Sequence, residues 1–392
     1  ARIRRCGILC HPTSFPSAYG IGDLGEGARQ FVDFATMAGQ TAWQILPLGP
    51  TGYGDSPYQP FSAFAGNPLL IDPVALAEEG LLTRDELEAA TAPSDCRVRY
   101  GEVIGSKRRL LAAAYRRFPG AVSDLRSEMQ AFREAQAAWL DDYALFMALK
   151  EHLNWAAWPA WEPELVRREP AALQTWRSRL RDEIGYHVFV QFIFERQWQR
   201  IHRYANDRSV SIIGDVPIFV GHDSADVWSH QELFYLDAAG QPTVVAGVPP
   251  DYFSPTGQRW GNPLYRWDVM ARDGYAWWLH RLQRALSQVD EVRIDHFRGF
   301  VNYWEVPATE PTAMHGRWRP GPGRAFFEAV AQVMGHLPII AEDLGMITSD
   351  VTQLREELGL PGMTVLQFAF DGDPANPHMP YNHVRRSVVY TG

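Results

Sequence analysis

The sequence predicts an α/β fold, a (β/α)8 TIM barrel with inserted subdomains. Three observations support this: seven short apolar segments recur along the 392 residues, helical patterns separate most of them, and two connections are too long for simple crossovers. Repeated strand, helix, strand units predict a parallel sheet with right-handed crossovers, for which a doubly wound sheet is the alternative. Because only seven strands are visible before Gly392, we expect the strand that closes the barrel to be missing from this sequence.

Each apolar segment is short enough to be a single strand and is followed by polar or glycine-containing residues. The segments are GILC (7–10), TAWQILPL (41–48), SIIGDVPIFV (211–220), EVRIDHF (291–297), PIIAED (338–343), MTVLQFAF (363–370) and SVVYT (387–391). Two of the intervening segments, 25–39 and 186–206, carry apolar residues at helical spacing, and the first stops at Gly39.

Two connections predict insertions into the barrel, which itself spans 1–392 and is truncated at its C-terminus. The connection 54–185 begins with glycine and proline turns and becomes charged and helical, so we expect an inserted helical subdomain at 75–185. The connection 221–290 is rich in proline, glycine and aromatic residues, especially over 244–267. A loop of this kind after a barrel strand typically helps to form a binding groove, so 221–290 is predicted to be a loop subdomain lining one.

Composition favours a neutral ligand. The net charge is −9 and no lysine or arginine tract occurs, which argues against nucleic acid as a partner. The chain has 14 Trp, 15 Tyr and 20 Phe, and such side chains can stack on sugar rings, although core packing explains many of them equally well.

The sequence predicts a cytoplasmic protein that does not enter a membrane. No apolar stretch approaches the roughly 18 to 20 residues needed to span a bilayer, and the N-terminus lacks a secretory pattern. Cys6, Cys10 and Cys96 show no metal-type spacing, so we expect free thiols.

The one nucleotide-like motif is better explained by local structure. GIGDLG (20–25) has the spacing G-x-G-x-x-G, but it follows a long polar loop and carries Asp23 where a phosphate would approach. Turn geometry and entry into a helix account for it. No P-loop, G-x-S-x-G or H-E-x-x-H motif occurs, so we expect neither a cofactor nor a metal.

Carboxylates follow three of the predicted strands. Asp215 follows SIIG, Asp295 follows VRI, and Glu342 follows PIIA with Asp343 beside it. Each alone is compatible with a helix N-cap or a loop hydrogen bond. In a parallel barrel, however, all three would lie at the C-terminal face, where barrel enzymes keep their active sites.

Two such carboxyl groups suit glycosidic chemistry, which needs a nucleophile and a general acid and base. The nucleophile must be ionised, and Arg293, two residues before Asp295 on the same strand face, favours its charged form. The acid must be protonated near neutral pH. Burial after an apolar strand, and the like charge of Asp343, are expected to raise the pKa of Glu342.

The stretch EVRIDHFRGF (291–300) contains both the arginine and the presumed nucleophile. Strand alternation places Arg293 and Asp295 on one face and Ile294 and His296 on the other. A lone Arg-x-Asp pair is more often a structural salt bridge than a catalytic one. His296 can share a face with Asp295 only if the strand ends before it.

At this point several motifs resemble one family, the 4-α-glucanotransferases of the α-amylase clan, also called amylomaltases or disproportionating enzymes. The matching blocks, in order, are HPTSFPSAYGIGDLG (11–25), GYGDSPYQPFSAFAGNPLLID (52–72), IIGDVPIFVGHDSADVW (212–228), GVPPDYFSPTGQRWGNPLYRW (247–267), EVRIDHFRGF (291–300) and PIIAEDLG (338–345). The resemblance implies a retaining enzyme that cleaves α-1,4-glucans or maltooligosaccharides through a covalent glycosyl-enzyme. The segment is then passed to the 4-hydroxyl of an acceptor, either glucose or a maltooligosaccharide.

The resemblance also implies roles for individual residues. Asp295 takes the nucleophile position of the R-I-D-H motif, and Glu342 takes the acid/base position of A-E-D. Arg293 orients the nucleophile and His296 binds substrate beside it. Asp215 matches the carboxylate of the G-D-x-P block, which contacts sugar hydroxyls.

Further residues are expected at the glucan groove. Tyr58, Gln258, Trp260 and Asn262 fall in the blocks that line it, and Asp343 is expected to bind substrate beside the acid/base residue.

In one respect the sequence departs from the family pattern. The third catalytic carboxylate of the family lies in a T-H-D-N block just after a strand like SVVYTG, and this sequence stops at Gly392. We expect the parent protein to continue, because an open barrel would expose an apolar edge.

Two alternative functions use the same residues differently. An α-glucan hydrolase of the α-amylase type would pass the glycosyl unit to water. A non-catalytic glucan-binding barrel would retain the aromatic residues; the missing third carboxylate favours this alternative, whereas Asp295 and Glu342 argue against it.

Overall fold

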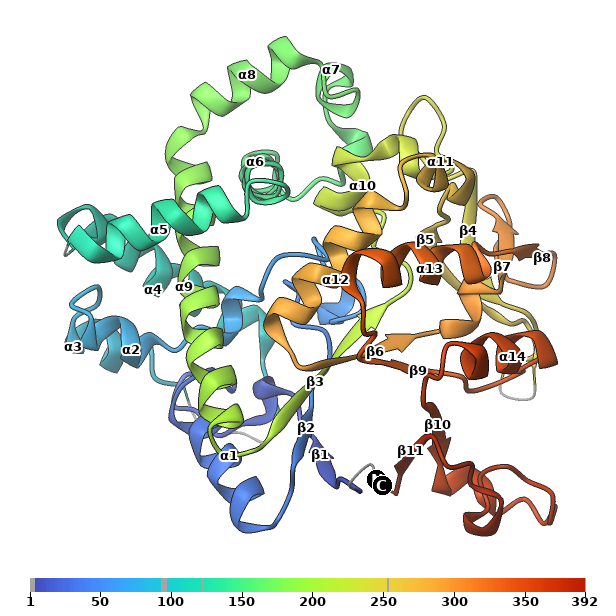
Figure 1. The fold of residues 1–392 in the computed structure, drawn as a ribbon. Coiled ribbons are helices and arrows are strands. Elements are labelled where there is room, and N and C mark those ends of the chain that lie inside the picture. Colours follow the sequence, from blue (N-terminus) through green and yellow to red (C-terminus); the bar gives the residue numbers. More distant parts are fainter. Residues whose placement is uncertain (1–3, 93–96, 122, 252–253, 392) are drawn as a thin grey trace. The chain divides into compact units, whose positions relative to one another are not determined.

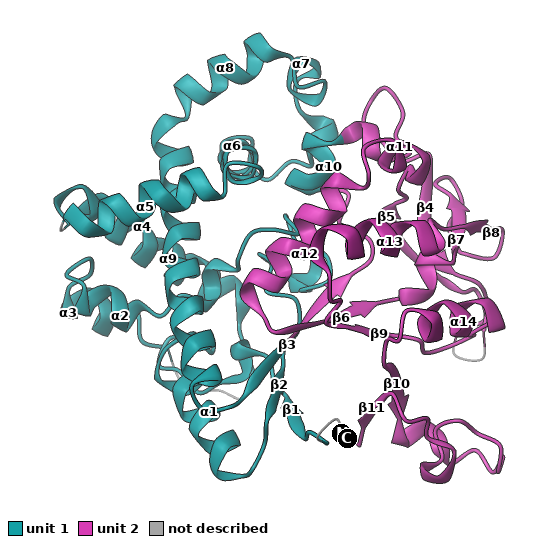
Figure 2. Cartoon of the chain, in the orientation of Figure 1, with its two compact units in different colours: residues 1–212, 223–230 teal, residues 213–222, 231–392 magenta. Residues whose placement is uncertain are grey.

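The computed structural model describes residues 4–92, 97–121, 123–251 and 254–391. These residues form two compact units, shown in Figure 2. Unit 1 consists of Ala1–Ile212 and Asp223–His230, and unit 2 consists of Ile213–His222 and Gln231–Gly392.

Unit 1 is mostly helical (Figure 1). Two short strands, β1 (Gly7–Leu9) and β2 (Ala42–Gln44), pair in parallel with Ile8 opposite Trp43. The helices are α1 (Glu26–Met37), α2 (Pro73–Glu78), α3 (Arg84–Ala89), α4 (Tyr100–Arg117), α5 (Ser123–Ala135), α6 (Leu140–His152), α7 (Pro163–Val166), α8 (Pro170–Arg179), α9 (Arg181–Asn206) and α10 (Ala225–Ser229). Short 3-10 helices are η1 (Pro12–Ser14), η2 (Tyr53–Asp55), η3 (Pro68–Leu70), η4 (Phe118–Gly120) and η5 (Trp158–Ala160).

Both helices predicted from periodicity are present in unit 1. Helix α1 buries Ala28, Val32 and Ala35 and is followed by Gly39, whose φ of 68° is left-handed and favours glycine. Helix α9 begins earlier than expected and packs against α6. Most of unit 1's helices lie in the predicted 75–185 subdomain, whose limits stay a prediction.

Unit 2 contains the parallel strands that matter for the site. Strand β3 (Ser211–Pro217) starts in unit 1 and continues in unit 2, where it pairs in parallel with β6 (Glu291–Asp295). Strand β6 pairs in parallel with β9 (Ile339–Ala341) on its other side. A separate parallel pair consists of β10 (Gly362–Val365) and β11 (Ser387–Tyr390).

Four helices and four short 3-10 helices complete the helical content of unit 2 in the described residues. They are α11 (Trp267–Arg272), α12 (Ala276–Gln288), α13 (Gly323–Met334), α14 (Ser349–Glu357), η6 (Gln231–Leu233), η7 (Phe297–Phe300), η8 (Leu366–Ala369) and η9 (Pro380–Asn382). Aromatic side chains of α12, η7 and α13 form much of the core, with the rings of Phe300 and Phe326 4.8 Å apart.

All seven predicted strand segments contain a strand, but each strand ends before its segment does. TAWQILPL contains only the short strand Ala42–Gln44. MTVLQFAF continues only to Val365 and then turns into η8, and SIIGDVPIFV ends its strand at Pro217. A proline cannot donate to a sheet hydrogen bond, which accounts for the boundary at Pro217.

One sheet of unit 2 was not predicted. Strands β4 (Val244–Val248), β5 (Gln258–Pro263), β7 (Asn302–Pro307) and β8 (Arg317–Pro320) form an antiparallel sheet in the order β5, β4, β7, β8. Its first two strands lie in the 221–290 segment that was predicted as a loop subdomain. The register shifts between Val245 and Gly247, which breaks the alternation that reveals a strand in a sequence.

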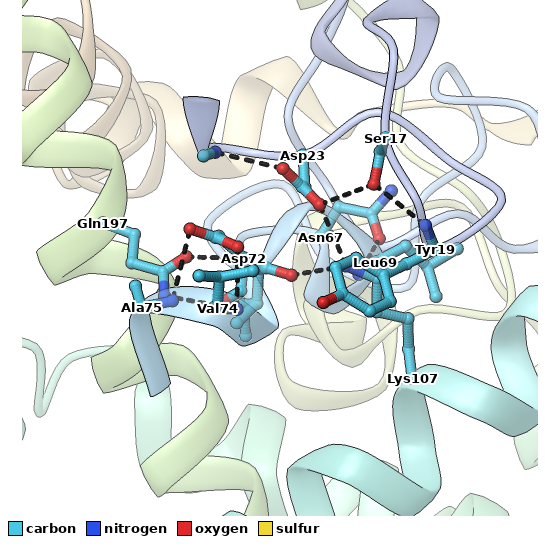
Figure 3. A network of polar contacts seen from close by, with 12 residues as sticks. Ser17, Tyr19, Asp23, Asn67, Leu69, Asp72, Val74, Ala75, Lys107 and Gln197 are labelled. Carbon is cyan, nitrogen blue, oxygen red and sulfur yellow. Dashed lines mark hydrogen bonds and ion pairs between the residues drawn. The ribbon is translucent and has the colours of Figure 1, made fainter. Parts of the chain in front are cut away.

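The GIGDLG loop has a structural role in unit 1 (Figure 3). Asp23 accepts hydrogen bonds from the Ser17 hydroxyl at 3.0 Å and from the Gly25 N–H at 3.1 Å, and helix α1 starts directly after Gly25. The Lys107 ammonium lies 3.7 Å from Asp23 and donates to the Ile71 carbonyl at 2.5 Å. Entry into a helix thus explains the motif, as expected.

Two further predictions concern membrane-spanning helices and the cysteines. Among the helices of the described residues, none has both the length and the apolar character required to cross a membrane. Cys6 and Cys10 are free thiols, while Cys96 lies outside the described residues.

Candidate active site

The strand register of unit 2 brings the predicted carboxylates together. Asp215 on β3 is directly opposite Arg293 on β6, and Pro217 is opposite Asp295. Glu342 directly follows β9, whose last residue is opposite Ile294. Parallel strands end at the same edge of a sheet, so the three carboxylates that sequence placed at strand ends meet at one edge.

Strand β6 shows the alternation that the sequence predicted. Val292 and Ile294 are fully buried on one face, while Glu291, Arg293 and Asp295 are less buried on the other. Arg293 and Asp295 therefore point the same way, as an ion pair requires.

Arg293 binds two carboxylates at once. Its Nη1 donates to Asp215 Oδ1 at 2.7 Å and its Nη2 donates to Asp295 Oδ1 at 2.6 Å. Burial alone would lower the pKa of Arg293, but the charges of Asp215, Asp295 and Glu342 outweigh it and raise the pKa. The Asp215 side chain is 1% exposed and that of Asp295 is 33% exposed, so Asp295 is the one open to a ligand.

Glu342 is the carboxyl group that holds a proton near neutral pH. Burial, followed by the negative charge of Asp295, raises its pKa to about 7. Arg293 and two backbone N–H donors oppose the rise: His296 N–H donates to Oε2 at 2.8 Å and Leu344 N–H to Oε1 at 3.0 Å. The pKa of Glu342 is therefore raised as expected, but the like charge responsible is Asp295 rather than Asp343.

The strand ends before His296, which answers the question of its orientation. His296 has φ 57° in the left-handed region, and η7 begins directly after it, so alternation no longer applies. Its ring meets Trp260 edge-on at 4.9 Å and lies 6.5 Å from Phe219. Burial lowers the pKa of His296 to about 4, so the ring is neutral at physiological pH.

One atom of His296 has no hydrogen-bond partner in the described part of the chain. Its Nε2 is buried, and none of the described residues donates to it or accepts from it. A buried polar atom without a partner is costly. That His296 binds a substrate hydroxyl stays a prediction.

The remaining predicted residues have different surroundings. On β5, Gln258 is exposed and accepts from Trp260 Nε1 at 3.1 Å. Asn262 is buried and donates to the Val220 carbonyl at 2.8 Å, which favours a structural role over the expected contact with a glucan. Tyr58 lies in unit 1, and its role stays a prediction.

Asp343 was expected to bind substrate, but protein groups occupy its carboxylate. Oδ2 accepts from Arg355 Nη1 at 2.9 Å and Oδ1 accepts from the Met363 N–H at 2.7 Å. This arrangement favours a supporting role. Sequence reasoning missed Arg355 and Met363, because no local pattern indicates which helix residue will reach a strand end twelve residues earlier.

The site combines a carboxylate bound by an arginine with a second carboxyl group whose pKa is raised to about 7. Among the described residues, no group of three or more His, Cys, Asp or Glu side chains could hold a metal ion. At the ends of neighbouring parallel strands, such a pair is typical of barrel enzymes that act on glycosidic bonds.

Comparisons with known proteins identify the family. A sequence profile described as 4-alpha-glucanotransferase matches residues 10–392. The 4-alpha-glucanotransferase of Thermus thermophilus is 53% identical over 392 residues, covering 99% of this chain and 78% of the relative. That of a Synechocystis species is 52% identical over 394 residues, with coverage of 99% and 78%. The chain therefore belongs to the 4-alpha-glucanotransferase family, whose members act on α-1,4-glucans and maltooligosaccharides.

A solved structure supports the fold class. The amylomaltase from Streptococcus agalactiae, solved in complex with acarbose, is 40% identical and matches with a TM-score of 0.96 over 99% of this chain and 79% of its own. This likeness, with the parallel pairing of the strands, confirms the predicted fold class of a parallel β/α barrel, whose closure is not seen in the described residues; the inserted subdomains stay a prediction. The third carboxylate, which the resemblance places after Gly392, stays a prediction.

Proposed function

We propose that Asp295 and Glu342 carry out retaining transfer of α-1,4-glucan segments from a maltooligosaccharide donor to the 4-hydroxyl of glucose or another maltooligosaccharide. The observation that carries the assignment is the contrast between the two carboxyl groups. Asp295 is bound to Arg293 at 2.6 Å, while burial and the charge of Asp295 raise the pKa of Glu342 to about 7. Environments that separate two carboxyl groups in this way assign the base and acid roles.

In the first step, Glu342 donates its proton to the glycosidic oxygen while an Asp295 oxygen bonds to the anomeric carbon and the glycosidic bond breaks. The leaving glucan departs with the proton and Asp295 holds the glycosyl unit as an ester. In the second step, the acceptor's 4-hydroxyl attacks the same carbon, Glu342 takes the hydroxyl proton, and the bond to Asp295 breaks.

Other residues of unit 2 support this chemistry. Arg293 holds Asp295 and Asp215 on fixed sides of its guanidinium group, which limits the orientations of the nucleophile. The neutral ring of His296 offers Nε2 to a sugar hydroxyl. Trp260, half-buried on β5 beside His296, offers an aromatic face for a sugar ring.

Incubation with maltotriose tests the function. Transfer predicts glucose together with a ladder of shorter and longer maltooligosaccharides at a constant number of reducing ends. The assay uses a chain that continues through the expected T-H-D-N block, since the resemblance assigns the third carboxylate to it. A steady rise in reducing ends would mean hydrolysis, and binding without turnover would mean a glucan-binding barrel.

Variants assign the roles within the same assay. Asp295→Asn should abolish turnover, because an amide cannot act as the nucleophile. Asp268→Asn is the matched control, because Asp268 lies in the same unit but pairs on the surface with Arg272 at 3.4 Å. Near-normal activity of Asp295→Asn would contradict the assignment.

A further inference from the structure

Asp343 stands next to the acid/base residue, yet its carboxylate is held by α14 and β10. Both oxygens are engaged, by Arg355 Nη1 at 2.9 Å and by the Met363 N–H at 2.7 Å. The side chains of Asp343 and Arg355 are 11% and 10% exposed, so this is a largely buried ion pair. A buried pair of this kind is costly unless its geometry is well defined, which indicates a positional role.

The backbone of β10 is shaped to accept this pair. A Cβ on Gly362 would lie 2.2 Å from Arg355 Nη1 and 2.5 Å from Asp343 Oδ2. A side chain at Gly362 would therefore displace the paired ends of Arg355 and Asp343. The Ala341 N–H also donates to the Pro361 carbonyl at 2.9 Å, which joins the ends of β9 and β10.

The ion pair between Asp343 and Arg355 acts on Glu342 through the backbone. Asp343 is the middle residue of the turn in which the Leu344 N–H donates to Glu342 Oε1 at 3.0 Å. Holding Asp343 fixes that turn, and so fixes the donor that orients the Glu342 carboxyl group. Arg293 and Asp295 from β6 are the other charged groups that act on Glu342, and His296 contributes a backbone N–H.

The Met363 side chain links Asp343 to Arg293. Met363, whose N–H binds Asp343, places its Sδ 3.2 Å from Arg293 Nε. Arg293 Nη1 and Nη2 already bind Asp215 and Asp295, so the thioether contacts the remaining edge of the guanidinium group.

We propose that Asp343, Arg355 and Met363 form a positioning cluster, anchored on Gly362, that fixes both the acid/base Glu342 and the Arg293 that holds the nucleophile. In this proposal none of the three side chains contacts sugar. The inference rests on the proposed function and replaces the substrate-binding role expected for Asp343.

The test compares Asp343→Asn, Arg355→Met and the double variant in the transfer assay, using the form of the protein in which the wild type is active. Each single variant should lower kcat about 100-fold while KM for maltotriose stays within about twofold, because misplacing a catalytic group by about 1 Å costs about that much. The double variant should be no worse than the single ones, since all three lose the same interaction. Arg355→Lys should recover part of the rate.

Two further readouts separate positioning from general destabilisation. Arg196→Met, which removes a partly buried ion pair with Glu79 in unit 1, should lower Tm without lowering kcat. In Arg355→Met, a loosened turn weakens the Leu344 N–H bond, one of the interactions that hold down the pKa of Glu342. The fall of kcat at high pH should therefore occur at a higher pH in Arg355→Met than in the wild type. In Arg196→Met it should occur at the same pH as in the wild type.

Three outcomes would overturn the proposal. A rise in KM with unchanged kcat in Asp343→Asn alone would mean that Asp343 binds sugar. A lowered Tm with wild-type kcat would mean that the cluster is only structural, and additive losses in the double variant would mean that Asp343 and Arg355 act separately. Failure of the proposed function itself would be seen separately, as a wild type that makes no ladder from maltotriose.

Discussion

At the scale of single residues, Glu342 shows how opposing interactions determine the pKa of one carboxyl group. Two backbone N–H donors and Arg293 favour its ionised form, yet burial and Asp295 raise its pKa from 4.5 to about 7. That change corresponds to about 3 kcal/mol in favour of the protonated form, since each tenfold change in proton affinity is about 1.4 kcal/mol. A carboxyl group that accepts two hydrogen bonds can thus still hold a proton near neutral pH.

The pH dependence of the rate follows from this value. In the proposed first step Glu342 donates a proton, so kcat/KM should fall as pH rises through about 7, where its carboxyl group ionises. His296 is neutral near pH 7, because its pKa is lowered to about 4, so it does not contribute to this fall in kcat/KM. Measuring kcat/KM for maltotriose between pH 5 and 9 checks this; a flat profile over that range would contradict the role of Glu342.

The orientation of His296 could not be predicted from the sequence. Alternation placed Arg293 and Asp295 on one face, and the structure agrees. The left-handed φ of His296 cannot be read from the sequence, since a non-glycine residue adopts it only where the surrounding structure imposes it. Sequence therefore found the residue but not its orientation.

At the scale of elements, buried apolar strands were the most predictable features. Each of the seven segments contains a strand because runs such as PIIA and VRI are β-rich and bounded by polar residues. The antiparallel sheet of unit 2 was missed because β4 has a register shift and β5 begins with exposed Gln258 and Arg259. The partners of Asp343 were missed because they come from α14 and β10, and pairing across elements leaves no local signal.

The network around Lys107 gives a prediction at the same scale (Figure 3). Its side chain is 3% exposed, and it joins α4 to Asp23 and to the Ile71 carbonyl next to α2. Lys107→Met keeps much of the packing but removes the charge and leaves buried Asp23 without this cation. We expect the free energy of unfolding to fall by about 3 to 5 kcal/mol, the usual effect of removing one partner of a buried ion pair.

A surface pair serves as the control for Lys107. Arg84 and Glu88 are paired at 3.0 Å but are 90% and 66% exposed, so Arg84→Met should change stability by less than about 1 kcal/mol. Urea unfolding monitored by tryptophan fluorescence measures both variants. Equal effects of the two substitutions would show that the Lys107 network does not hold unit 1 together.

At the scale of the whole molecule, composition anticipated the class of ligand but not the division into units. A net charge of −9 and abundant aromatic residues fit a neutral glucan. The limits 75–185 and 221–290 stay predictions, since domain limits depend on long-range packing. The residues that we assign to the chemistry all lie in unit 2, whereas the Lys107 network lies in unit 1. Substitutions in the two places therefore test different properties, reaction and stability.

The central claim is that Asp295 carries the glycosyl unit, and trapping that intermediate tests it most directly. The Glu342→Gln variant is incubated with α-maltosyl fluoride, whose leaving group departs without a general acid, while the second step lacks its general base. Peptide mapping by mass spectrometry should find one maltosyl unit on the peptide that contains Asp295, and none when Asp295→Asn is added. An adduct on another residue, or no adduct with a product of inverted anomeric configuration, would contradict the account.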